Sequence, residues 1–270
     1  MSEYLGLSNS ESIAAIIRAL CSNDSSSNTL IEQFTDTCDS LESSEVDEAF
    51  SQLGREGLKF HDRPEVIELY NGVIQDKLVA ASLNRYAPGH PVRVYLEENL
   101  LIRSLFSQLN KIAPITEPHR KAAEVLIGDL SNVELHYLRK ENQLFPLLER
   151  HEWDGPSNNM WPIHDEIRAK LKQARTLVGE GAIETLNSCL GSLQIEMLRL
   201  MSIEEETLFP NAMELLEEQE WKQMREGDAE IGWMFAEEPV MFPPQSTGRS
   251  EAVDDNYVHP SQLTEPSELP

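Results

Sequence analysis

The stretch Glu134–Pro146, ELHYLRKENQLFP, decides the fold, because its ending returns in Ile203–Pro210, IEEETLFP. Both copies end in Leu-Phe-Pro, and acidic residues precede that ending at matching distances. Aligning Phe145 with Phe209 sets His136 opposite Leu200, Lys140 opposite Glu204, and Glu141 opposite Glu205. The repeat predicts two related pairs of helices whose polar positions face a shared interior.

The segments upstream of the two copies also resemble each other. Asn99–Arg103, NLLIR, lines up with His164–Arg168, HDEIR. Apolar residues at helical spacing predict four long helices joined by short, turn-rich connections. Because short connections make consecutive helices run antiparallel, the pattern predicts an all-α, up-down-up-down four-helix bundle. The predicted helices cover about residues 91–112, 118–149, 160–179 and 182–218.

Composition divides the rest of the chain into further units. We expect a flexible N-terminus with one short, loosely held helix over residues 1–28, and a small domain of three helices over 29–85. The Pro-flanked segment Tyr86–Pro91, YAPGHP, begins the bundle unit of residues 86–235. Residues 236–270 are rich in Pro and acidic side chains, which predicts a disordered tail.

The net charge of the chain disfavours two classes of binding partner. The chain carries 22 Lys and Arg against 47 Asp and Glu, a formal net charge of −25. Phosphate backbones and anionic lipid surfaces repel such a protein, so we expect neither nucleic acid nor membrane as a partner. The three cysteines form no Cys-x-x-Cys pair, which favours a reducing cytoplasm. Hydrolase and phosphate-cradling motifs are also missing, which disfavours the hydrolase and kinase classes, and we favour a binding module over an enzyme.

Histidines and carboxylates on the predicted helices point to a metal site. In an antiparallel bundle, side chains from several helices meet at one level of the core, and carboxylate-bridged metal sites are built in this way. Imidazole and carboxylate are ligands that suit iron. One His on each helix, with an acid four residues after the His on the second and fourth, would be a strong signal for such a site, because positions i and i+4 share one helix face.

The chain resembles the hemerythrin-like HHE cation-binding family. More closely, it resembles the subgroup in which a small helical domain of unknown function precedes the bundle and a PAS sensor domain often follows. The resemblance covers about residues 29–235. The residues that carry it are the two Leu-Phe-Pro endings, Glu97–Arg103, Met160–Arg168, Gly89-His-Pro91, Arg139–Asn142 and Asp228–Gly232.

The resemblance implies six metal-ligand positions, and three of them hold other residue types. Asn99, Lys140 and Leu200 stand where the family has His, a carboxylate and His, respectively. The positions that keep ligand-type residues are His136, His164 and Glu204. These three come from three predicted helices, and we expect their side chains to converge at a common depth. The residues available as replacement ligands are His90, Glu98 and Glu141.

Two accounts of the core follow. In one, His136, His164 and Glu204, with the replacement ligands, hold a divalent cation or a mononuclear or dinuclear iron site. In the other, the ammonium of Lys140 sits where a metal would be and pairs with Glu204 or Glu98, because a buried cation must be paired. The second account leaves a metal-free polar core.

The resemblance implies a cytoplasmic, regulatory module that binds a cation or small ligand and senses redox state, a gas or a metal. One alternative is an iron-handling or iron-sulfur repair protein in nitrosative or oxidative stress, which needs redox-active iron. The other alternative is a metal-free scaffold for a protein partner, which predicts that His136→Ala and His164→Ala leave function intact.

Overall fold

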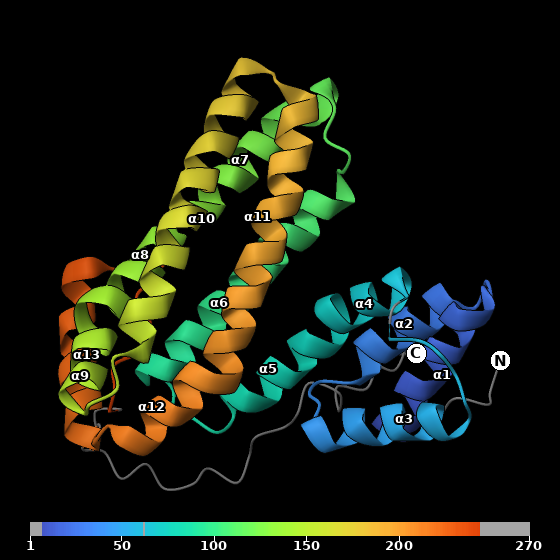
Figure 1. Cartoon of the computed structure of the whole chain (residues 1–270), viewed down its shortest axis with the longest axis horizontal. Coiled ribbons are helices and arrows are strands. Elements are labelled where there is room, and N and C mark those ends of the chain that lie inside the picture. Colours follow the sequence, from blue (N-terminus) through green and yellow to red (C-terminus); the bar gives the residue numbers. More distant parts are fainter. Residues whose placement is uncertain (1–6, 62, 244–270) are drawn as a thin grey trace, which may run out of the picture.

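The structure is a computed structural model that describes residues 7–61 and 63–243. Every regular element in these residues is a helix and none is a strand, which confirms the predicted all-α class. The helices form two units, each with its own hydrophobic core (Figure 1). Within the described ranges, none of the helices is both long and apolar enough to cross a bilayer.

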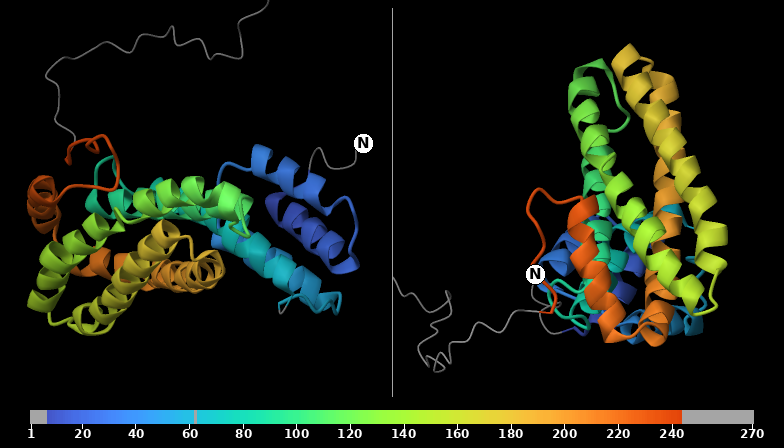
Figure 2. Two further views of the ribbon diagram at one scale, coloured as in Figure 1. Left: turned by 90° about the horizontal axis from the view of Figure 1, so that it is seen from above. Right: turned by 90° about the vertical axis from the view of Figure 1, so that its left-hand side faces the viewer.

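Four long helical rods make up the larger unit (Figure 1). The first and third rods each pack against the second and the fourth, so the four rods enclose one core. The views in Figure 2 show the rods running alongside one another. The rods comprise α6 (Pro91–Lys111); α7 (Arg120–Leu130), α8 (Val133–Arg139) and α9 (Phe145–Arg150); α10 (Gly155–Glu180); and α11 (Ile183–Ile203) with α12 (Phe209–Leu215).

Both Leu-Phe-Pro endings lie where the helix widens into a π-helical turn. These turns are η3, Lys140–Leu144, and η4, Glu204–Leu208, and the α-helix resumes after each of them. Pro146 and Pro210 follow directly in α9 and α12. A proline has no N–H to donate and its ring clashes with the carbonyl four residues earlier, so a widened turn lets the rod continue. Neither Pro146 nor Pro210 ends its rod.

The small unit contains one more packed helix than the sequence predicted. α1, Asn9–Ser22, buries Ile13 and Ile17 completely against the other helices of this unit. Burying two isoleucine side chains stabilises the packed state by roughly 1.5–3 kcal/mol each. The prediction of a loosely held first helix is therefore wrong. The other elements are α2 (Ser27–Thr37), α3 (Ser43–Arg55), α4 (Pro64–Leu69), η1 (Tyr70–Ile74) and α5 (Gln75–Leu83).

The last described segment closes one end of the bundle. α13, Glu218–Ile231, packs against α6 and α8, and it is followed by residues 232–243, which we call the C-terminal strap (Figure 1). The strap passes so close to Gly89 that a β-carbon there would lie 2.0 Å from the Val240 carbonyl oxygen, and Gly89 has a positive φ of 76°. Arg225 donates to the Pro239 carbonyl oxygen at 2.6 Å. The predicted disordered tail thus begins too early, because residues 236–243 are held against the bundle; residues 244–270 lie outside the described ranges.

Candidate functional site

Ionic and polar side chains form a network inside the apolar core of the bundle, which we call the polar core. They come from α6, from α8 and η3, from α10 and from η4. Burial of ionisable groups is costly unless each is paired, so every partner in this network matters for stability. The members, each at most 6% exposed, are Glu98, Asn99, Arg103, His136, Arg139, Lys140, Glu141, His164 and Glu204.

Lys140 and Glu204 form the central ion pair. The Lys140 ammonium donates to Glu204 Oε1, and both side chains are at most 1% exposed. Asn99 Nδ2 donates to Oε2 of the same carboxylate at 3.3 Å. Burial by itself would raise the pKa of Glu204, but the Lys140 charge and His136 outweigh burial and hold that pKa well below its usual range. Glu204 is therefore ionised, and a cation of the protein itself neutralises it.

His136 links this pair to a second carboxylate. Its Nε2 lies 3.3 Å from Glu204 Oε2, and its Nδ1 lies 2.8 Å from Glu98 Oε2. Glu98 also accepts from Arg139, and its Oε1 accepts from the Met234 N–H at 2.9 Å. Although burial opposes ionisation of Glu98, these partners lower its pKa below the ordinary value. Glu98 thus ties the polar core to the C-terminal strap.

His164 is held in the same way by a different carboxylate. Its Nδ1 lies 2.7 Å from Glu141 Oε1, and Arg168 donates to both oxygens of Glu141. Burial and the nearby Lys140 charge lower the pKa of His164 to about 4, so the imidazole is neutral at pH 7. Because a carboxylate accepts from Nδ1, we assign the ring proton to Nδ1 and the lone pair to Nε2. That buried Nε2 has no hydrogen-bond partner among the described residues.

Glu205 connects the polar core to the small unit. It accepts from Arg103 and Asn99 in the bundle, at 2.9 and 3.1 Å, and from Gln75 Nε2 of α5 at 2.9 Å. Burial outweighs these donors and raises the pKa of Glu205. The roles of Arg103 and Gln75 are not visible in the sequence motifs, because neither residue has ligand chemistry and Gln75 lies in another unit. The acidic run at residues 204–206 was the one sequence signal for this contact.

The structure brings most of the predicted site residues together. His136, Glu98 and Glu204 are in direct contact, and Glu141 holds His164. The His164 ring stacks on Tyr137, with ring centroids 4.1 Å apart, and Lys140 lies over the face of the same Tyr137.

His90 lies at the start of α6, apart from the other predicted site residues. Its Nδ1 accepts the Val92 N–H as the N-cap of α6, and its ring packs against Trp221 and Phe242. Asn99 is nine residues further along α6, about 13 Å away along the axis. His90 therefore caps the helix beneath the strap, and hydrogen bonds join it to no member of the polar core among the described residues.

The residues of the polar core do not fit a di-iron centre. Lys140 pairs with the carboxylate that a metal would need, and both ring nitrogens of His136 lie on carboxylates. Of the two core histidines in the described residues, His164 leaves a ring nitrogen, Nε2, without a partner, which suits a metal ligand. Across residues 7–61 and 63–243, no three His, Cys, Asp or Glu side chains are grouped so that they could hold a metal ion.

Another buried carboxyl, that of Asp228, lies beside this network. Asp228 of α13 is 1% exposed, and burial raises its pKa to about 7 against the opposing charges of Arg139 and Arg225. An acid whose pKa rises on folding stabilises the fold below its unfolded pKa, and this contribution is lost as the pH rises to the folded value. The pH window runs from about 3.8 to about 7.

We therefore expect Asp228→Asn to change the pH dependence of stability. The variant should gain unfolding free energy relative to the wild type as the pH rises from 4 to 8, by at least about 1 kcal/mol. Urea unfolding of both proteins at several pH values measures this difference. A difference that stays constant across the range would contradict a buried acid with a raised pKa.

Comparison with known proteins agrees with the bundle. Residues 90–212 match the family model for the hemerythrin HHE cation binding domain, which confirms over this range the similarity that the motifs predicted. A search of curated proteins found no match. The matched range contains α6 to α11 and ends within α12. The small unit, α13 and the strap lie outside it.

Proposed function

We propose that this protein is a non-enzymatic regulatory module in which the Lys140 ammonium takes the place of a bound metal cation. The observation that carries the proposal is the buried contact between Lys140 and Glu204 at the centre of a cation-binding type of bundle. A lysine at this position supplies the positive charge that the surrounding carboxylates require. It supplies no redox chemistry and no open coordination position, so the iron-handling alternative has no support from these residues.

The arrangement of the network suggests what such a module does. Hydrogen bonds and ion pairs run from Gln75 of the small unit through Glu205 and Asn99 to Glu204, and through His136 and Glu98 to the strap. Coupling between distant sites is carried by packed polar networks of this kind, typically with 0.5–2 kcal/mol modulated by single residues. The proposed role is therefore to make the contact of the strap with Glu98 depend on the contact of the small unit with Glu205.

Hydrogen exchange tests this coupling. In Gln75→Ala the Glu205 carboxylate loses a donor from the small unit, and we expect the Met234 amide in the distant strap to exchange severalfold faster than in the wild type. Gln52→Ala is the matched control, because among the described residues the Gln52 side chain bonds only Glu56, at the surface of the small unit. If Gln75→Ala speeds exchange in α5 and leaves Met234 unchanged, the coupling does not exist.

A further inference from the structure

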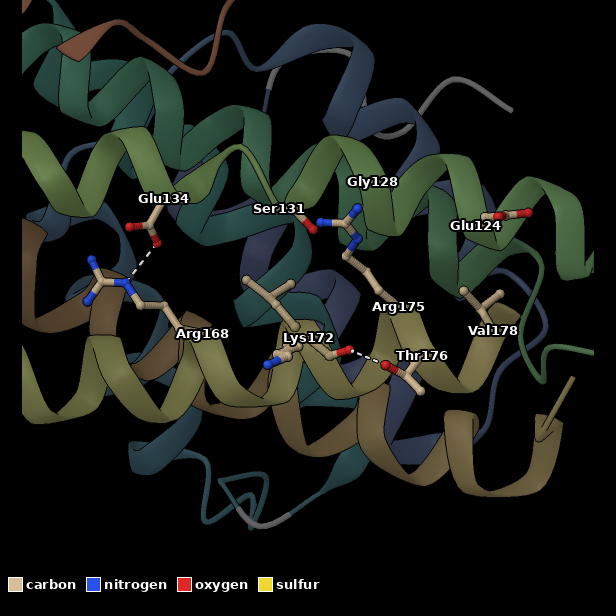
Figure 3. Close-up of a pocket in the computed structure, with 10 residues that line it drawn as sticks. Glu124, Gly128, Ser131, Glu134, Arg168, Lys172, Arg175, Thr176 and Val178 are labelled. Carbon is tan, nitrogen blue, oxygen red and sulfur yellow. Dashed lines mark hydrogen bonds and ion pairs between the residues drawn. The ribbon is translucent and has the colours of Figure 1, made fainter. Parts of the chain in front are cut away.

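A groove of about 820 Å³ runs along the outside of the bundle between α7–α8 and α10, and Figure 3 shows the residues that line it. Its size is in the range of small-molecule sites, roughly 300–1,000 Å³. Leu171 and Val178, both at most 5% exposed, form an apolar floor. Gly128 on the facing helix contributes no side chain, and a β-carbon built there would meet no atom within 4 Å. The groove is therefore open where α7 faces α10.

One wall of the groove is a stripe of cations. Arg168, Lys172 and Arg175 lie on one face of α10 at spacings of four and three residues. Figure 3 shows Arg175 reaching across the groove towards Ser131 and Gly128. Arg168 is engaged by carboxylates, including Glu134 at 2.7 Å. By contrast, no hydrogen bond or ion pair to the Lys172 or Arg175 side chain is found in the described part of the chain.

Lys172 and Arg175 place two positive charges beside the apolar floor, in a chain whose formal net charge is −25. Glu124 also borders the groove, at the end where Val178 lies, so an anion is favoured at the stripe and disfavoured at that end. The combination selects a ligand with one anionic group and an apolar body.

We propose that the groove binds a small amphipathic carboxylate. Its head group pairs with Arg175 and Lys172, and its apolar body lies on Leu171 and Val178. From Arg168 to Val178 the groove follows α10 for roughly 15 Å at 1.5 Å per residue, which suits an extended aliphatic chain or a fused-ring acid.

The groove is physically connected to the polar core. Arg168 borders the groove and also donates to Glu141, which holds His164. A carboxylate in the groove would compete with Glu141 and Glu134 for this guanidinium. The inference rests on the proposed regulatory function, for which it supplies the class of ligand.

Calorimetric titration of the full chain with decanoate, below its micelle concentration, tests the site. We expect one saturable site, with binding at least about tenfold weaker in Arg175→Glu because the head group meets a like charge. Gly128→Leu should also weaken binding at least about tenfold by filling the groove. It should fold normally, because its β-carbon meets no neighbour and leucine favours a helix over glycine by up to about 1 kcal/mol.

The matched control is Gly191→Leu, at a helical glycine of α11 whose surroundings are equally open and which does not line the groove. It should bind decanoate like the wild type. Equal binding of decanoate by Gly128→Leu and the wild type would overturn the proposal, as would binding of decanol as tight as that of decanoate. Preference for a short acidic peptide without an apolar tail would also overturn it. None of these results depends on the metal content of the protein, so failure of this site and failure of the proposed function can be told apart.

Discussion

Lys140→Met should destabilise the protein by about 3–5 kcal/mol, because it leaves the carboxylate of Glu204 buried without its counter-charge. Glu204 is at most 1% exposed and cannot reach solvent without disrupting the core. The remaining contacts, from Asn99 and His136, are both 3.3 Å long. Urea unfolding followed by circular dichroism measures the loss. In a protein of ordinary stability, 5–15 kcal/mol, this loss removes a large share.

Lys170→Met is the matched control for this experiment. Lys170 also pairs with a glutamate on another helix of the bundle, Glu196, but these two side chains are 27% and 31% exposed. Partly exposed pairs contribute at most about 1 kcal/mol, so the control should lose little. The double variant Lys140→Met/Glu204→Leu should recover much of the loss, because replacing both partners leaves no unpaired charge. A Lys140→Met cost no larger than that of Lys170→Met would show that Lys140 does not neutralise the core.

The triple variant Asn99→His/Lys140→Glu/Leu200→His should gain stoichiometric binding of iron or cobalt. It places ligand-type residues at all six positions that the family resemblance implies. The two core histidines, His136 and His164, already have the second partner that a metal-binding histidine needs. A carboxylate holds the Nδ1 atom of each, and this arrangement orients a histidine towards a metal. Leu200 is buried four residues before Glu204, so a histidine there shares its helix face.

Titration with Co²⁺, followed by visible absorption, measures this gain. The same variant carrying His136→Ala is the control and should bind much more weakly. If the triple variant folds and binds no metal, the six positions are not the ligand set, and the place assigned to Lys140 loses its support.

The helical class could be predicted from local spacing, and the family resemblance predicted that His136 and Glu204 lie close together in the core. Apolar residues at helical intervals identify the rods, and the repeated Leu-Phe-Pro ending sets Lys140 and Glu204 at equivalent positions. Two equivalent positions on diagonally opposite rods of an antiparallel bundle can meet in its core. The choice between a metal and an internal cation could not be made from spacing, because Lys140 could also have pointed to solvent.

Other features required the three-dimensional structure. The contact of Glu98 with the Met234 N–H joins positions 136 residues apart, and no motif connects α6 with the strap. The packing of α1 was not predicted, because a polar, Ser-rich segment follows this helix and its burial depends on helices later in the chain. The groove was not predicted either, because Lys172 and Arg175 have the pattern of an ordinary solvated helix face until α7 is placed opposite them.

The central claim is that the protein supplies its own cation, and the metal content of the wild-type chain tests it most directly. The protein should be purified anaerobically without chelators from cells supplied with iron, manganese and zinc, and then analysed for metals beside the triple variant. We expect no stoichiometric metal in the wild type and bound metal in the variant. One or two metal ions per wild-type chain, lost in His136→Ala, would contradict the account.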